Sequence, residues 1–190
     1  MPEFLLITTW LVICYLLGTL SLGDLLGRFK GVDLRTIGTM NPGATNIYKT
    51  LGPIYGITIF MLDVSKGLLA TLLPLYLFNV GIYVAFLSML LLMAGHLMKS
   101  PWSKAGGTGM ATTMGACCAL LPMGLMIALF PSVLVLMVTK NTTYTGIFAF
   151  LLAIIGSWLA QGNLIQVLSV LIAAGLVLLK YRLQYNRILE

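Results

Sequence analysis

Long apolar runs separated by short polar stretches make up nearly the whole chain. Six such runs extend approximately over residues 4–26, 54–78, 81–98, 111–139, 144–160 and 164–179. A membrane-spanning helix needs about 20 predominantly apolar residues, so the pattern predicts an all-α, polytopic transmembrane helical bundle. The runs leave no room for a separate soluble domain, and we expect residues 1–190 to form a single domain. The first run passes Leu17 without a small-residue cleavage site, so we expect it to be retained.

The fourth run contains a helix-breaking sequence, "LLPMG", at residues 120–124. Proline and glycine interrupt helices where the freed backbone groups can be satisfied. The run is therefore predicted to form two segments, about 111–121 and about 124–139. The first would span only about 16 Å of a roughly 30 Å hydrocarbon core. Such a half-length helix is tolerated where protein covers it or where it lines a cavity.

The basic residues favour seven crossings over six. With the amino terminus outside, the loops after the first and third runs are cytoplasmic and carry Lys and Arg, as the positive-inside rule requires. Six crossings would leave Lys140 and the basic tail around Lys180 outside, whereas seven return both to the cytoplasm. We therefore expect seven segments, one of them short, with the amino terminus outside and the carboxyl terminus cytoplasmic.

The amino-acid composition limits the kinds of molecule that the protein is expected to bind. Only 8% of residues are charged and 59% are hydrophobic, against about a quarter charged in an average soluble domain. The net charge of +6 is explained by topology signals, so we expect a lipid bilayer and no nucleic acid as partner. The three cysteines, Cys14, Cys117 and Cys118, lie in apolar runs without a CxxC or His/Cys pattern, which indicates packing residues and no metal site.

Four polar clusters would face the cytoplasmic side. They are the loop "TIGTMNPGATNIYKTLG" (residues 36–52), the helical "LDVSKG", "GHLMKSPWSKAGGTGMATTMG" from residue 95 onward, and the basic tail "KYRLQYNR" from residue 180 onward. The candidate residues in them are Thr39, Asn41, Thr45, Asn46, Lys49, Asp63, Lys66, His96, Lys104, Gly106, Gly107, Thr108 and Gly109.

Each cluster alone allows a structural interpretation as well as a functional one. The glycines can simply form a turn, Asp63 and Lys66 can form an i,i+3 ion pair, and His96 can be an interfacial residue. Ionisable residues inside a membrane run are costly, however, and are functional by default. Taken together, glycine-rich turns that open onto a short helix favour an anion site, since free N–H groups and the helix dipole both attract negative charge.

The segments "YLLGTLSLGDLLGR", "KGVDLRTIGTMNPGATNIYKTLG", "LDVSKG" and "GGTGMATTMG" resemble the motifs of the bacterial acyl-phosphate:glycerol-3-phosphate acyltransferases. The resemblance runs in order from about Tyr15 to Gly115 and continues as hydropathy and a basic tail. It implies a seven-helix membrane enzyme of phospholipid synthesis in the bacterial cell membrane. The implied reaction transfers an acyl chain from acyl phosphate to the 1-hydroxyl of glycerol 3-phosphate, forming lysophosphatidic acid without coenzyme A or another cofactor.

The resemblance also implies roles for individual residues. Thr39, Asn41 and His96 would be catalytic. Substrate or phosphate would be bound by Thr45, Asn46, Lys49, Asp63, Lys66, Lys104, Gly106, Gly107, Thr108, Gly109, Tyr181 and Gln184.

Several of these positions depart from the family pattern. Thr39 replaces a serine and keeps the hydroxyl, whereas Lys49 replaces an arginine and loses its bidentate fork. Thr108 stands where the family has a lysine, which removes a positive charge. A histidine and an asparagine of the family's tail fall on Tyr181 and Gln184.

A second hypothesis therefore stays open beside the enzyme. It is a diverged, catalytically weakened paralogue that binds or moves a phospholipid or acts on another polyol phosphate, and Thr108 is the residue that favours it. A channel or ion transporter is a weaker alternative, because the sequence contains no charged ring and no repeated half.

Overall fold

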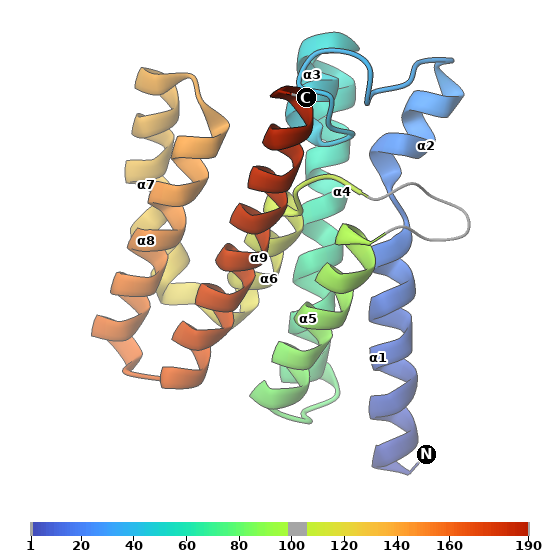
Figure 1. The fold of residues 1–190 in the computed structure, drawn as a ribbon. Helices are drawn as coiled ribbons and strands as arrows, with labels where there is room; N and C mark the ends of the chain where they lie inside the picture. Colours follow the sequence, from blue (N-terminus) through green and yellow to red (C-terminus); the bar gives the residue numbers. More distant parts are fainter. Residues whose placement is uncertain (1, 99–105, 190) are drawn as a thin grey trace.

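The computed structural model describes residues 2–98 and 106–189, and all regular elements in these ranges are helical (Figure 1). The prediction of an all-α fold is confirmed. In chain order the elements are α1 (Glu3–Thr19), α2 (Leu22–Phe29), α3 (Ala44–Thr50), α4 (Pro53–Leu72), the π-helical turn η1 (Leu73–Leu77), α5 (Ile82–Leu97), α6 (Met110–Leu120), α7 (Pro122–Thr139), α8 (Thr142–Gln161) and α9 (Leu164–Leu189).

Most of these helices are suited to a membrane. Within the described residues, five segments are long and apolar enough to cross one, and α5 and α6 are shorter apolar helices. The predicted polytopic membrane protein is therefore confirmed. The two termini lie at opposite ends of the bundle in Figure 1, as an odd number of crossings requires. The count of seven and the side on which each terminus lies stay predictions.

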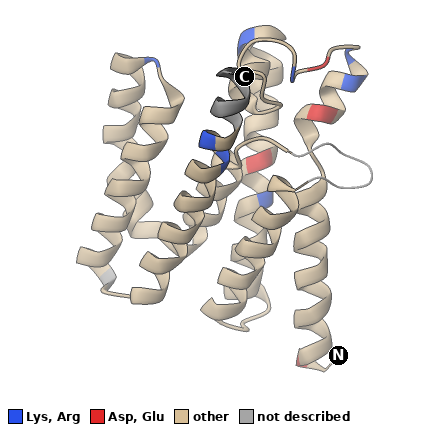
Figure 2. Cartoon of the chain, viewed as in Figure 1, with Lys and Arg blue, Asp and Glu red and all other residues tan. Residues whose placement is uncertain are grey.

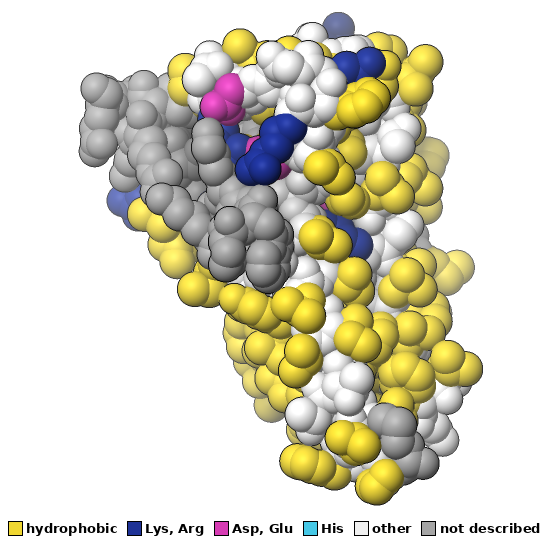
Figure 3. All heavy atoms as spheres, turned by 90° about the vertical axis from the view of Figure 1, so that its right-hand side faces the viewer, with side chains coloured by type: hydrophobic (Ala, Val, Ile, Leu, Met, Phe, Trp, Pro, Cys, Tyr) yellow, Lys and Arg dark blue, Asp and Glu magenta, His cyan; other side chains and the backbone are white. Residues whose placement is uncertain are grey.

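Charge and apolar surface are distributed as a bilayer demands. Figure 2 shows Lys and Arg mainly in the half of the bundle that holds the carboxyl terminus. On the side of α1 and α2, Figure 3 shows hydrophobic side chains covering the lower part of the surface, with the charged side chains above them. Leu5, Val12 and Leu16 of α1 are among the exposed large hydrophobic residues. A face of this kind is compatible with lipid tails.

The expected break in the fourth apolar run is confirmed. Helix α6 ends at Leu120, Leu121 leaves the helical conformation (φ −131°, ψ 58°), and Pro122 begins α7. Proline at the first position of a helix costs no hydrogen bond, because a backbone N–H there would have no partner within the helix. The break makes α6 only 11 residues long.

Helix α4 packs against the short helix α6 so closely that the two backbones are in contact at a glycine on each helix. A Cβ atom added to Gly67 would lie 1.9 Å from the carbonyl oxygen of Thr112, and one added to Gly115 would lie 2.0 Å from that of Val64. Small residues at helix crossings permit this contact in membranes. A half-length helix in a membrane must be covered by protein, and α4 covers α6 on this side.

The helices differ from the approximate apolar runs at two ends, and the longest polar loop holds a helix of its own. The first run, expected to continue to Leu26, breaks after α1, and the side chain of Ser21 caps α2 by accepting from the N–H of Asp24. The freed carbonyl oxygen of Leu20 accepts a hydrogen bond from Lys66 Nζ at 3.0 Å. The long polar loop contains α3, and α9 continues ten residues beyond the end of the apolar run at Leu179, because the basic tail is itself helical.

The membrane orientation can be tested by thiol labelling. In a variant without the three native cysteines, Glu3→Cys at the amino-terminal end should react with an impermeant maleimide in intact cells. Tyr144→Cys, at the exposed start of α8, should react only after permeabilisation, because the basic end faces the cytoplasm. The reverse pattern would mean that the orientation is inverted.

The α4–α6 contact predicts a stability difference between two glycines. Gly67→Ala should destabilise the protein by about 1–3 kcal/mol, because the new methyl group overlaps a helix backbone that cannot move aside. The matched control is Gly175→Ala in α9, where nothing lies within 4 Å of the added carbon; alanine there should be neutral or stabilising by about 0.5–1 kcal/mol. Thermal unfolding in detergent compares the two, and equal midpoints would contradict the tight crossing.

Candidate functional site

The centre of the candidate site is the place where α5 ends and α6 begins. His96 lies in the last turn of α5 and is only 4% exposed. Its carbonyl oxygen accepts a hydrogen bond from the N–H of Gly106 at 3.0 Å. The glycine turn, Gly106–Gly109, therefore folds back onto His96. Gly109 has φ +78°, a conformation that favours glycine, and it directly precedes α6.

The loop between α2 and α3 reaches the glycine turn. A Cβ atom on Gly107 would lie 3.1 Å from Asn41 Oδ1 and 3.4 Å from the Cα atom of Gly43. The two polar segments that the sequence assigned to one side of the membrane are thus in contact. A side chain at position 107 would meet a tight contact with Asn41.

Asn46 holds the loop in its shape. Its Oδ1 accepts from the N–H of Thr39 at 2.8 Å, and its Nδ2 donates to the carbonyl oxygens of Leu34 and Ile37 at 3.0 and 3.1 Å. The residue is 1% exposed, and a Cβ atom on Gly38 would lie 2.1 Å from its Oδ1. This amide is occupied by the backbone of its own loop, so the contacts of Asn46 are those of a positioning residue.

Asp63 and Lys66 form the expected i,i+3 ion pair. Lys66 Nζ lies 2.9 Å from Asp63 Oδ1, and both residues are buried. The same ammonium group donates to the carbonyl oxygen of Leu20, so the pair fastens the end of α1 to α4.

Polar atoms without partners surround the glycine turn. Among the described residues, Asn41 Oδ1, His96 Nδ1 and Thr112 Oγ1 are buried and make no hydrogen bond. Leaving a buried polar atom unsatisfied costs about 1–3 kcal/mol. Thr112 belongs to the first turn of α6, where the backbone N–H groups also lack intrahelical acceptors. The arrangement offers donors and acceptors from three segments to a polar, negatively charged ligand.

Other candidate residues lie apart from this centre. Thr45 Oγ1 is 3.3 Å from Thr142 Oγ1 and so connects α3 to α8. Lys49 is exposed in the last turn of α3, and no hydrogen bond or ion pair in the described ranges joins it to the glycine turn. Tyr181 is 40% exposed on α9. Lys104 lies outside the described residues, as does the side chain of Gln184.

Sequence reasoning missed several residues of this region. Asp24 and Arg35 form a two-pronged ion pair, with Nη2 to Oδ2 at 2.8 Å, which ties α2 to the following loop. Beside it lies a cavity of about 190 Å³ lined by Asp24, Arg28 and Arg35, among others. The signal for this pair was a single acidic residue near the end of an apolar run. The described residues hold no group of three or more His, Cys, Asp or Glu side chains that could bind a metal ion.

Comparison with known proteins identifies relatives over nearly the whole chain. The family model described as "Glycerol-3-phosphate acyltransferase" matches residues 8–190. A protein of that name from Aquifex aeolicus is 32% identical over 182 residues, which cover 94% of this chain and 93% of the relative. Another, from Desulforamulus reducens, is 37% identical over 172 residues, covering 88% and 86%.

Two solved structures share the fold. A crystal structure of an integral membrane glycerol 3-phosphate acyltransferase in its glycerol 3-phosphate form superposes with a TM-score of 0.86 at 27% identity, covering 96% of this chain and 92% of that one. The lysophosphatidic acid form gives 0.82 at 26% identity, covering 96% and 91%. The resemblance inferred from the motifs is confirmed.

The role of Asn46 predicts that Asn46→Asp loosens the loop. The substitution keeps an oxygen for the N–H of Thr39 but places a carboxylate against the carbonyl oxygens of Leu34 and Ile37, at a cost of about 1–3 kcal/mol or more. Limited proteolysis should cut between residues 31 and 43 faster than in the wild type. Asn79→Asp, at an exposed turn, is the control. Equal cutting of both variants would show that the amide does not hold the loop.

Proposed function

The chain belongs to the glycerol-3-phosphate acyltransferase family, and from that premise we propose that it transfers an acyl chain to the 1-hydroxyl of glycerol 3-phosphate. The donor in this proposal is acyl phosphate, and the products are lysophosphatidic acid and inorganic phosphate. The relatives' names and the glycerol 3-phosphate and lysophosphatidic acid forms of the similar structures support the acceptor and the product.

One observation carries the proposal beyond family membership. The buried, unpartnered atoms Asn41 Oδ1, His96 Nδ1 and Thr112 Oγ1 come from different segments in the polar region around the glycine turn. That turn leads into the amino terminus of α6, where free N–H groups and the helix dipole stabilise an anion. A phosphorylated polyol offers phosphate oxygens to the N–H groups and hydroxyls to the side chains.

The chemistry needs no covalent enzyme intermediate. The 1-hydroxyl oxygen attacks the acyl carbonyl carbon, a carbon–oxygen ester bond forms, and the bond from that carbon to the phosphate oxygen breaks. The hydroxyl proton leaves with the departing phosphate, which is itself basic, so no separate protein base is required. The protein contributes orientation of the two substrates and stabilisation of the charge on phosphate.

The predicted residues divide between these two tasks. Gly107, Thr108 and Gly109 hold phosphate through backbone N–H groups, whereas the N–H of Gly106 fixes the turn to His96. Asn41, His96 and Thr39 orient the substrates. Lys49 contributes positive charge from α3 at the same end of the bundle. Asn46 acts through the loop that it fixes, and the Asp63–Lys66 pair acts through the α1–α4 junction that it stabilises.

The location of the reaction follows from the same arrangement. The site lies towards the end of the bundle where basic residues gather (Figure 2), and this end is cytoplasmic by the positive-inside rule. We place the enzyme in the bacterial cytoplasmic membrane, with the polar acceptor entering from the cytoplasm and the acyl chain remaining in the bilayer.

The proposal is tested with purified protein in lipid nanodiscs. Acyl phosphate and labelled glycerol 3-phosphate should give lysophosphatidic acid and inorganic phosphate in equal amounts, and acyl coenzyme A should not replace the donor. Asn41→Ala should lower kcat/KM about tenfold or more, because a polar contact with the substrate is lost. Thr8→Ala, on the exposed surface of α1, is the matched control. A wild type that makes no product would contradict the proposal.

The diverged paralogue is the second candidate, and the uncharged Thr108 is the observation that favours it. Thr108→Lys separates the two, because an ammonium group beside the anion strengthens a charge-assisted contact by about 1.5–3 kcal/mol. An acyltransferase should bind glycerol 3-phosphate more tightly with this lysine. A protein adapted to another ligand should gain nothing for glycerol 3-phosphate, and a panel of polyol phosphates would then identify its preference.

A further inference from the structure

Thr112 has a buried hydroxyl group without a hydrogen-bond partner. The residue is 1% exposed, and its Oγ1 makes no hydrogen bond in the part of the chain that the structure describes. Two other buried hydroxyl groups there, those of Ser132 and Ser157, also lack partners, but they lie in α7 and α8. Thr112 is the third residue of α6, one helical turn after Gly109. Because side chains lean towards the amino terminus of a helix, that of Thr112 leans towards the glycine turn.

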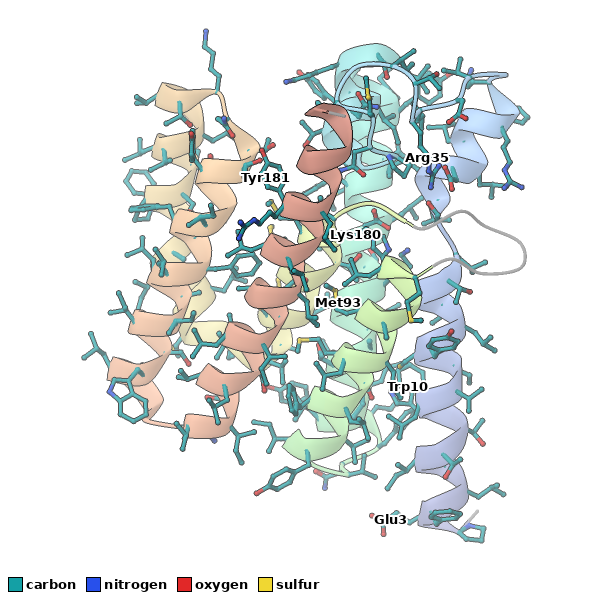
Figure 4. All side chains as sticks on the ribbon, in the orientation of Figure 1. Glu3, Trp10, Arg35, Met93, Lys180 and Tyr181 are labelled. Carbon is teal, nitrogen blue, oxygen red and sulfur yellow. The ribbon has the colours of Figure 1, made fainter. Side chains whose placement is uncertain are left out.

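Most buried hydroxyl groups in the other helices find an acceptor in the protein. Ser88 Oγ donates to the carbonyl oxygen four residues earlier at 2.7 Å, Ser169 Oγ does so at 2.6 Å, and Thr71 Oγ1 at 3.2 Å. Thr113, the neighbour of the unpartnered threonine, donates from Oγ1 to Met93 Sδ at 3.1 Å, and Met93 lies between α5 and α6 (Figure 4). Bonds of this kind satisfy a hydroxyl group without any ligand.

The backbone before α6 explains why Thr112 does not bond in the same way. Its acceptor four residues earlier would be the carbonyl oxygen of Thr108. Gly109 follows with φ +78° and ψ 7°, outside the right-handed helical conformation, so the Thr108 carbonyl group is not aligned with α6. The carbonyl oxygen of Gly109, three residues earlier, already accepts from the N–H of Thr113 at 2.8 Å. The hydroxyl group is therefore left for a partner outside α6.

The surroundings of Thr112 favour an anion as that partner. The first N–H groups of α6 have no acceptor within the helix, and the amino terminus of a helix stabilises negative charge. The His96 ring borders the same turn: a Cβ atom on Gly106 would lie 3.3 Å from its Nε2, and one on Gly109 would lie 3.5 Å from its Cδ2. His96 is 4% exposed, and its Nδ1 lacks a partner as well. Two buried polar side chains beside one helix terminus thus await a ligand.

We propose that Thr112 is a phosphate-binding residue whose hydroxyl group donates to the substrate phosphate at the amino terminus of α6. The inference deepens the proposed function and rests on it for the identity of the substrate. The N–H groups of Gly107, Thr108 and Gly109 approach the phosphate from the turn, and the hydroxyl group approaches it from the first turn of α6. A hydrogen bond to an anionic oxygen is stronger than one between neutral groups, so phosphate compensates the hydroxyl for its burial.

Valine at this position separates a binding role from a structural one, because it keeps nearly the shape of threonine and removes the hydroxyl group. A hydroxyl group that serves the fold should leave the free protein less stable when it is lost. A hydroxyl group kept for a ligand should leave the free protein more stable, since no buried polar atom then lacks a partner. Stability without ligand and affinity for phosphate should therefore change in opposite directions in Thr112→Val.

The experiment measures binding of inorganic phosphate and of glycerol 3-phosphate, and thermal unfolding without ligand, for the full chain in nanodiscs. Thr112→Val should weaken the binding of both compounds about tenfold to a hundredfold and raise the unfolding midpoint by about 2–4 °C. Thr112→Ser keeps the hydroxyl group and should bind both compounds nearly as the wild type does.

Thr71→Val in α4 is the matched control. The Thr71 hydroxyl group is also fully buried, but it donates to carbonyl oxygens of α4 and to that of Ala116. Its loss should lower the unfolding midpoint and change the affinity for phosphate little, which is the reverse of the result expected for Thr112→Val. If Thr112→Val does not accumulate, Thr112→Ala removes the same hydroxyl group without new bulk, and the same loss of binding is expected.

The possible failures are distinguishable. Binding of inorganic phosphate by Thr112→Val as tight as that of the wild type would overturn the inference, and the proposed function would stand if this variant still forms lysophosphatidic acid. Weaker binding of glycerol 3-phosphate alone would place the hydroxyl group at the glycerol part and also overturn the inference. A wild type that binds both compounds but forms no lysophosphatidic acid would contradict the proposed function alone. If the wild type binds neither compound, both fail.

Discussion

A helix that begins inside a membrane protein must satisfy its first backbone N–H groups without bulk water. Helix α6 is such a helix, since it has 11 residues and is buried against α4 along Gly67 and Gly115. Its amino terminus cannot retreat to the surface, because the backbones of α4 and α6 are in contact. The rest of the site can be understood as a polar environment built around that terminus.

That environment is assembled from separate parts of the chain. The α2–α3 loop brings Asn41, the end of α5 brings His96, and the first turn of α6 brings Thr112. Other residues hold the surrounding segments in place. Asn46 fixes the α2–α3 loop, and the Asp63–Lys66 pair fixes the end of α1. The polar residues that stabilise the fold and those that are available to a ligand are therefore mostly different residues. This division lets the site present unpartnered atoms while the supporting loops stay ordered.

Much of the fold was predictable because lipid restricts what a spanning segment can be. The apolar runs predicted where the long helices lie, and Pro122 predicted the position of the break before α7 to within a residue or two. The partner of the carbonyl oxygen freed at Leu20 was not predictable, because Lys66 lies 46 residues away in sequence. The Asp24–Arg35 pair was missed for the same reason: it is a tertiary contact without a local pattern.

Within the site, residue types were easier to predict than contacts. Glycine and asparagine in the loop and the turn indicated an anion site, and the two segments do meet at Asn41 and Gly107. Sequence alone could not show that the amide of Asn46 is fully used by its own loop, or that Lys180 turns towards α5. Motif matching weights residues by family pattern, and in the tail that pattern was matched at Tyr181 and Gln184.

The contact between Asn41 and Gly107 has a consequence for biosynthesis. The two residues are separated by 66 positions, so the ribosome completes α1 to α5 before the glycine turn exists. During that interval the loop of Asn41 has nothing to pack against on this side, and the nascent protein presents an incomplete polar surface to the insertion machinery. The site therefore matures late, when α6 docks against α4. A chain that stalls after α5 would hold Asn41 and His96 but neither the glycine turn nor α6. The docking of one short helix is therefore the step that completes the site.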